Sequence, residues 1–75
     1  MIGMLWYDNS KSDLATKIDS AASYYQEKYG ETASLCLVSP VEMKGNKIII
    51  PGIEVRTDRH VLRNHLWIGK EDGER

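Results

Sequence analysis

Apolar residues recur at helical spacing through the first half of the chain. Between Ser10 and Gly30 they fall three or four positions apart, which is the spacing of one face of an α-helix. Ser10 with Asp13 fits a capping box at the start, and Gly30 fits a left-handed cap at the end. The pattern predicts a helix over residues 11–29 whose buried stripe comprises Leu14, Ile18, Ala21, Ala22, Tyr25 and Tyr29.

The other apolar segments are short and bounded by turn residues, which is typical of strands. The first covers residues 4–7 and the last residues 66–68. Residues 34–38 are mostly apolar at consecutive positions, which indicates an interior strand buried on both faces. Residues 48–50 and 53–57 are separated by a Pro-Gly pair and indicate two strands or one bent strand. Apolar and polar residues alternate in 53–57, so one face of that strand is expected to be wet.

The polar stretches are expected to form connections and ends of a single small domain over residues 1–75. Residues 43–47 contain a Gly-Asn pair and predict a loop or hairpin turn, and residues 58–65 predict a turn or a short helix. The charged residues 70–75 are expected to fray. Residues 1–3 precede a second methionine and are interpreted as a frayed start or a vector remnant.

The order of the elements predicts an α+β fold, with a single helix packed on a small mixed sheet of about four strands in β-α-β-β-β order. A strand-helix-strand unit such as the first three elements usually makes a right-handed parallel crossover. In a short chain another strand can lie between the two parallel strands. One helix is about 10 to 12 Å across, whereas four strands span roughly 14 Å between outer axes. The helix therefore covers one face, and the consecutive apolar residues predict a second face that also needs cover. A two-fold homodimer is the leading expectation, and a small protein partner is the alternative.

Composition narrows the classes of function. The chain has 75 residues and a formal net charge of −1, which excludes the strongly basic profile of many nucleic-acid-binding domains. One cysteine, Cys36, excludes an intrachain disulfide, and no zinc-site spacing of Cys and His is present. No apolar run approaches the roughly 18 residues of a membrane span, and no signal-peptide pattern appears, so a cytoplasmic location is expected.

One segment is locally basic. Residues 56–70 carry Arg56, Arg59, Arg63 and Lys70, with Asp58 as their one acid. If residues 56–63 were helical, three arginines and His60 would share a face, and arginine matches the geometry of phosphate. Together with Trp67 or Tyr7 for base stacking, these residues make single-stranded nucleic acid the alternative ligand. The candidate binding residues are Arg56, Arg59, His60, Arg63, His65 and Trp67. The competing interpretation is a solvated loop whose arginines pair with Glu54, Asp58 and the acidic tail.

Asp58, His60 and His65 are the one cluster of acid-base or metal-ligating types. A carboxylate can orient an imidazole for either role. The two histidines are five positions apart, which on a helix separates them by about 140°, and no metalloenzyme signature is present. We therefore predict no metal ligand, no cofactor and no catalytic residue, and a small hydrolase or metal enzyme ranks third among the hypotheses.

The aromatic and thiol side chains are expected in the core or at an interface. Cys36 lies in the most apolar strand and is expected to be buried and unreactive. Trp6 and Trp67 lie in the first and last strands and would meet if those strands were neighbours. The predicted interface residues are Trp6, Trp67 and Ile49. The leading hypothesis is a small protein-interaction module acting through self-association or a protein partner, and the alternative is a nucleic-acid accessory protein.

Overall fold

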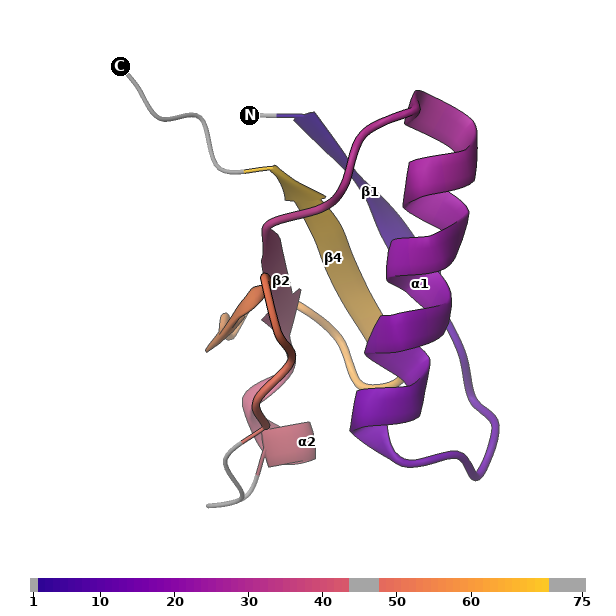
Figure 1. Ribbon diagram of the computed structural model, residues 1–75. Helices are drawn as coiled ribbons and strands as arrows, with labels where there is room; N and C mark the ends of the chain where they lie inside the picture. The colour runs from indigo at the N-terminus through magenta and orange to yellow at the C-terminus, as the bar shows by residue number, and fades with distance from the viewer. Residues whose placement is uncertain (1, 44–47, 71–75) are drawn as a thin grey trace.

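One long helix lies against one face of a sheet of four strands (Figure 1). The computed structural model describes residues 2–43 and 48–70. The elements in these residues are β1 (Ile2–Tyr7), α1 (Leu14–Tyr29), β2 (Leu35–Val38), α2 (Pro40–Met43), β3 (Glu54–Thr57) and β4 (His65–Lys70). The predicted α+β fold, with one main helix on a mixed four-stranded sheet, is confirmed.

The last strand of the chain is inserted between the first two. The strand order is β1-β4-β2-β3, and β4 pairs antiparallel with β1 on one side and with β2 on the other. β1 and β2 therefore run in the same direction with β4 between them, as the sequence allowed for a short crossover. β3 pairs parallel with β2 at the far edge. Because β4 makes two of the three strand pairings, the sheet is complete only when this strand is in place.

Two local hydrogen bonds set the ends of α1. Asp13 is the N-cap, and its carboxylate accepts from the backbone N–H of Thr16 at 2.9 Å. Gly30 adopts the left-handed conformation with φ 73°, and its N–H donates to a carbonyl of the last helical turn at 2.8 Å. The predicted start at residue 11 and the Ser10–Asp13 capping box are therefore wrong, because Asp13 itself caps the helix and Ser10 lies in the turn before it.

The core lies between α1 and the sheet. From the predicted helical stripe, Ile18, Ala21 and Tyr25 are at most 1% exposed. The sheet contributes buried residues from its two central strands, namely Cys36, Val38, Leu66 and Ile68. Tyr29 departs from the predicted stripe, since it is 39% exposed and packs on the Tyr25 ring with centroids 4.7 Å apart. Because no intrachain disulfide is possible, the fold depends on the packing of this cluster. Truncating Ile18 to alanine is expected to lower the free energy of unfolding by about 2 to 5 kcal/mol.

Residues 48–50 do not form the predicted strand. Ile50 instead makes an isolated antiparallel bridge with Ile53, whose N–H donates to the Ile50 carbonyl at 3.0 Å. The turn between them contains Pro51, which has no N–H for a sheet ladder, and Gly52, whose φ of 81° favours glycine. The segment is therefore a tight turn that leads into β3. In β3 the expected wet face is confirmed, because Glu54 and Arg56 are exposed while Val55 between them is half-buried.

Several connections also differ from the predictions. Residues 40–43 form the short helix α2, because the proline interpreted as ending a strand suits the first turn of a helix. Residues 58–64 form turns and bends, so the alternative of a short helix there is wrong. Residues 44–47 of the predicted 43–47 loop lie outside the described residues.

The two ends of the sheet extend further than predicted. β1 begins at Ile2 and β4 continues to Lys70. The predicted fraying is therefore wrong for Ile2, Gly3 and Lys70, because each is held by backbone pairing between the two strands. Residues 1 and 71–75 lie outside the described residues.

Candidate docking face

The face of the sheet turned away from α1 is built by alternate residues of three strands. Successive side chains of a strand point to opposite faces, and one set of these residues packs in the core beside α1. The strand register aligns Leu5, Trp67 and Leu37 in one row on the other face. Tyr7 and His65 form the next row, with ring centroids 4.9 Å apart. We call the five residues the open face: Leu5, Tyr7, Leu37, His65 and Trp67.

The open face is largely apolar and accessible to solvent. Leu5 is 64% exposed and Tyr7 is 58% exposed, while Leu37 and Trp67 are half-buried. The row ends at β3, where Arg56 lies beside Leu37 in the parallel register. Large contiguous apolar patches are uncommon on monomeric proteins and mark interaction surfaces. The sequence prediction of a second apolar face is thus matched by side chains that α1 does not cover.

The indole ring of Trp67 leans across β4 onto β1. A Cβ atom at Gly3 would overlap the six-membered ring of this indole, so the ring occupies the space above Gly3. Glycine is the residue that permits this close approach. Trp67 consequently forms a floor of the open face that extends to the outer strand.

A hollow of about 300 Å³ opens between the open face and the segment that joins β3 to β4. Its volume is at the lower end of the range for small-ligand pockets. Leu62 stands at its rim and is 68% exposed. The hollow is lined by Leu5, Leu37, Asp58, His60, Val61, Leu62, His65 and Trp67.

The joining segment is held in place by two hydrogen bonds to other parts of the chain and by one within the segment. Asn64 adopts a left-handed φ of 66°, which asparagine tolerates better than most residues. Its N–H donates to Oε2 of Glu42 in α2 at 2.6 Å, and its carbonyl accepts from the N–H of Asp8 at 2.8 Å. Within the segment, the N–H of Val61 donates to the Asp58 carbonyl at 3.0 Å. The rim of the hollow is therefore tied to both α2 and the end of β1.

The polar side of the hollow contains Asp58 and the two histidines. Oδ1 of Asp58 accepts from the backbone N–H of His60 at 2.8 Å and lies 3.0 Å from Nδ1 of the same residue. These hydrogen bonds hold the pKa of Asp58 below its ordinary value, and the one from the His60 backbone has the largest effect. Nδ1 of His65 lies 2.9 Å from the Arg63 carbonyl oxygen. Both imidazoles thus have Nδ1 engaged, and Nε2 is the nitrogen each has left for a ligand.

The structure brings Asp58, His60 and His65 to one hollow, but their contacts are those of turn residues. Asp58 closes the turn that follows β3, and the His60 side chain is 82% exposed. In the described residues no group of three or more His, Cys, Asp or Glu side chains is placed to hold a metal ion. The arrangement supplies a polar edge to an apolar hollow.

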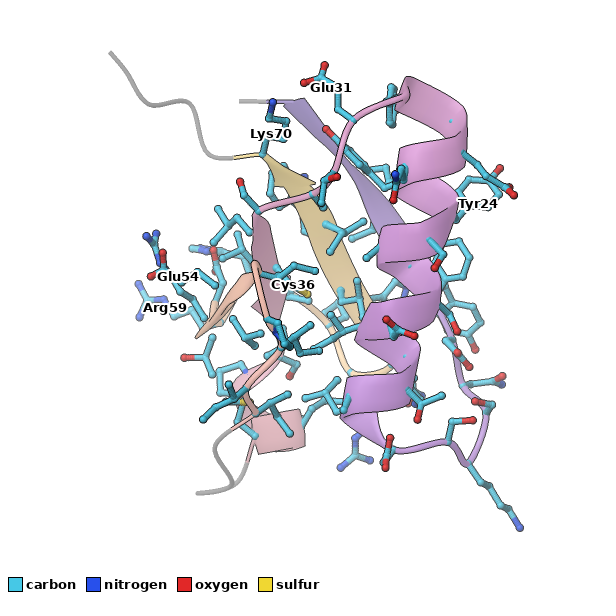
Figure 2. The ribbon with its side chains drawn as sticks, in the orientation of Figure 1. Tyr24, Glu31, Cys36, Glu54, Arg59 and Lys70 are labelled. Atoms are coloured by element: carbon cyan, nitrogen blue, oxygen red, sulfur yellow. The ribbon has the colours of Figure 1, made fainter. Side chains whose placement is uncertain are left out.

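The arginines of the basic segment do not share a helix. Arg56 lies on β3, where its Nε and Nη2 donate to the two carboxylate oxygens of Glu54 at 2.7 and 3.1 Å. This pairing lowers the pKa of Glu54. Arg59 and Arg63 lie in turns, so the alternative of a helical face shared by Arg56, Arg59, His60 and Arg63 is wrong. Glu54 and Arg59 lie on the side of the sheet away from α1 (Figure 2).

Lys70, the last member of the basic segment, lies at the opposite end of β4 from His65. Its Nζ bonds to Oε1 of Glu31 at 2.5 Å (Figure 2). This contact raises the pKa of Lys70. Lys70 therefore lies away from the loop that carries Arg59 and Arg63. The Arg56–Glu54 pair is one that the solvated-loop interpretation contained.

The two tryptophans lie on opposite faces of the sheet. β1 and β4 are neighbours, but Trp6 stands opposite Leu66 and Trp67 opposite Leu5, so the rings point in different directions. Trp6 packs against the core, 5.2 Å from the Tyr24 ring by centroids, and its buried Nε1 has no hydrogen-bond partner among the described residues. Trp67 is thus the tryptophan of the open face, and Trp6 belongs to the helix side.

Two further predicted residues are placed clearly by the structure. Ile49 is 77% exposed and does not line the hollow. Cys36 is buried between the sheet and α1, and burial raises the pKa of its thiol to about 12 (Figure 2). Its expected burial is confirmed.

Sequence reasoning missed most of the apolar residues that form this face. The sequence patterns place Leu5 and Leu37 in strands without assigning them a face, and they place Val61 and Leu62 in a polar connection. The available signal was the alternation itself. Once the helix-facing residues of each strand are known, their neighbours must point to the opposite face.

Comparison with protein-family models, with curated proteins and with solved structures finds no match for this chain. Among the described residues, no helix has the length and apolar character needed to cross a membrane. The class defined by the fold is a small α+β domain in which α1 covers one sheet face and part of the other face is accessible to solvent.

Proposed function

We propose that this chain is a small protein-interaction module whose open face is covered by another polypeptide when it functions. The observation that carries the proposal is the row of Leu5, Trp67 and Leu37, which is apolar across three strands and lies beside a hollow. Burying such side chains contributes about 25 cal/mol per Å² of apolar surface removed from water. The face thus offers binding energy that an isolated chain leaves unused.

The shape of the hollow favours bulky apolar side chains of the partner. Its lining is mainly aliphatic and aromatic, and its polar groups lie at one side, where Asp58, His60 and His65 can bond to the partner's backbone. Aromatic anchors that enter such pockets supply most of the energy of protein interfaces. We expect an apolar segment of a polypeptide, which is either another protein or a second copy of this chain.

The nucleic-acid alternative gains no supporting observation. A phosphate-binding surface needs cations that converge on one strip of the molecule. Here Arg56 is paired with Glu54, and Lys70 with Glu31 at the far end of β4. The interaction module is therefore the better-supported proposal.

The experiment compares two substitutions of exposed apolar residues. Leu62→Asp places a charge at the rim of the hollow, and Ile49→Asp places one at an equally exposed position outside it. Binding of a hydrophobic fluorescent dye and of peptides selected from a random library on the wild-type protein is measured for all three proteins. We expect Leu62→Asp to weaken peptide binding at least about tenfold, since a charge opposes burial in an apolar contact.

The control variant is Ile49→Asp. Ile49→Asp should bind the selected peptides as the wild type does, because that side chain lies away from the hollow. Equal binding by wild type and Leu62→Asp, or failure to select any peptide together with a monomeric mass at all concentrations, would contradict the proposal.

A further inference from the structure

The sheet has two outer strands, and they differ in how they are protected. β3 is four residues long and carries Glu54 and Arg56, which are features that discourage pairing with another chain. β1 is six residues long and contains neither a charged residue nor a proline. No strand of the described residues lies beyond it in the sheet order. β1 is therefore the unprotected edge.

The alternation of hydrogen-bonded and non-hydrogen-bonded pairs between β1 and β4 shows which backbone groups of β1 face outward. In an antiparallel pair, hydrogen-bonded and non-hydrogen-bonded positions alternate. The N–H of Asp8 donates to the carbonyl of Asn64, which continues the β1–β4 register by one pair. Asp8, Trp6 and Met4 therefore bond to β4. The N–H and C=O groups of Gly3, Leu5 and Tyr7 point to the free edge.

The pairings of β2 with β3 and with β4 lead independently to the same assignment of the β1 backbone groups. The N–H of Asp58 donates to the carbonyl of Val38, so Val38 bonds to β3 and its neighbour Leu37 bonds to β4. Leu37 stands opposite Trp67, so Trp67 uses its backbone groups on β2. Its neighbours Leu66 and Ile68 consequently bond to β1, opposite Trp6 and Met4.

We propose that β1 pairs antiparallel with β1 of a second copy of this chain, about a two-fold axis at Leu5. In this register each outward residue of one copy meets an outward residue of the other. Leu5 lies opposite Leu5, and Gly3 lies opposite Tyr7. This register contains three outward pairs, one of Leu5 with Leu5 and two of Gly3 with Tyr7. A register shifted by two residues in either direction contains only two outward pairs.

Side chains fit the same register. The Gly3 position carries no side chain, and the Trp67 ring already covers it, so the opposite Tyr7 ring meets an apolar indole surface. Aromatic residues paired with glycine across strands are a recognised way of protecting the glycine. On the helix side, Met4 lies opposite Trp6, and sulfur beside an aromatic ring is a favourable contact.

The pairing joins two sheets into one and leaves both open faces accessible on the same side. It thus goes beyond the proposed docking function and rests on a different observation, the unpaired backbone groups of β1. Its consequence for that function is bivalency, because two hollows lie on one continuous surface.

The first test uses the wild-type protein. Amide hydrogen exchange is measured by NMR across a concentration series, together with mass by light scattering. We expect a dimer whose Leu5 and Tyr7 amides become protected as concentration rises. The Met4 and Trp6 amides bond to β4 and should be protected at every concentration.

The second test separates the backbone from the side chain of Leu5. Leu5→Pro removes an outward N–H and leaves the β1–β4 ladder intact, and proline is tolerated at such edge positions. It abolishes both central bonds of the pairing, so the dimer dissociation constant should rise at least about tenfold. Leu5→Ala keeps the N–H and should lose less.

The third test reads the register. Leu5→Cys places two thiols directly opposite, at a Cα separation of about 5.5 Å that suits a disulfide. We expect rapid oxidation to a covalent dimer. Leu62→Cys, equally exposed but off the edge, should oxidise slowly, and the buried Cys36 should not interfere.

Three results would overturn the inference: a monomer at all concentrations, Leu5 and Tyr7 amides whose exchange does not respond to concentration, or a dimer that Leu5→Pro leaves intact. These outcomes are distinguishable from failure of the docking proposal, which is read from peptide binding by Leu62→Asp. A dimer lost in Leu62→Asp and kept in Leu5→Pro would identify the open face as the self-association surface instead.

Discussion

The indole of Trp67 lies directly over Gly3, where any Cβ atom would overlap it. Gly3→Ala should therefore force the ring away from β1, at a cost of roughly 1 to 3 kcal/mol in unfolding free energy. Urea denaturation and tryptophan fluorescence measure this loss. In a Trp67→Ala background the methyl group meets no ring, so Gly3→Ala should cost much less there. Equal costs in both backgrounds would show that Gly3 is required for another reason.

Glu42 connects α2 to the rim of the hollow through the N–H of Asn64. Glu42→Ala leaves that half-buried donor without this acceptor, which should lower stability by about 1 to 3 kcal/mol. Glu42→Gln retains an oxygen acceptor and should lose less. Thermal unfolding gives the stability, and dye binding reports whether the rim still shapes the hollow. If Glu42→Ala unfolds at the wild-type temperature, this contact does not hold the rim.

Asp13 links helix capping to acid stability. Hydrogen bonding with Thr16 lowers the pKa of Asp13, and the Thr16 side chain has a larger effect than its backbone N–H. A depressed pKa gives stability that is complete above the unfolded value, near 3.9, and is lost as pH falls through the folded value. Asp13→Asn keeps an N-cap acceptor without a titrating group. Its urea midpoint should therefore fall less than that of the wild type between about pH 5 and pH 2.

Asp13→Ala provides the matched control, because it removes the cap at every pH. Its melting temperature should be a few degrees lower than that of the wild type at neutral pH. A wild-type melting temperature for this variant would mean that α1 does not depend on its N-cap.

Cys36 should react slowly with thiol reagents in the folded protein, because its thiol is buried and its pKa is raised to about 12. Protein unfolded in urea should react at an ordinary rate. The same shift stabilises the fold below the unfolded pKa, near 9, and this contribution is lost as pH rises from there toward 12. Cys36→Ala should therefore lose less stability than the wild type across that pH range. Fast stoichiometric labelling of the native protein would contradict the burial.

Local periodicity was enough to predict much of the fold. The stripe around Ile18 and Tyr25 gave α1, and the apolar runs gave β1, β2, β3 and β4, because helix and strand periods are properties of neighbouring residues. Predictions that needed exact backbone geometry were less successful. Asp13 rather than Ser10 caps α1, and the run beginning at Ile48 forms a turn, since capping and turn formation depend on a few hydrogen bonds rather than on a period.

The candidate site depended on contacts between distant residues. The sequence predicted that an apolar face would remain uncovered, but it named both Trp6 and Trp67 as interface residues and offered a helical arginine face as one alternative. Insertion of β4 between β1 and β2 decided otherwise, by setting Leu5, Trp67 and Leu37 in one row. A slip of one residue in either register would have turned that row toward α1.

The sequence by itself therefore determined the main helix, the four strands of the sheet, the α+β class and the shortage of helix relative to sheet. Only the tertiary structure decided which side chains share the open face and which backbone groups of β1 remain unpaired. The physical reason is that strand pairing joins residues far apart in the chain, and its register is set by packing that no local pattern contains.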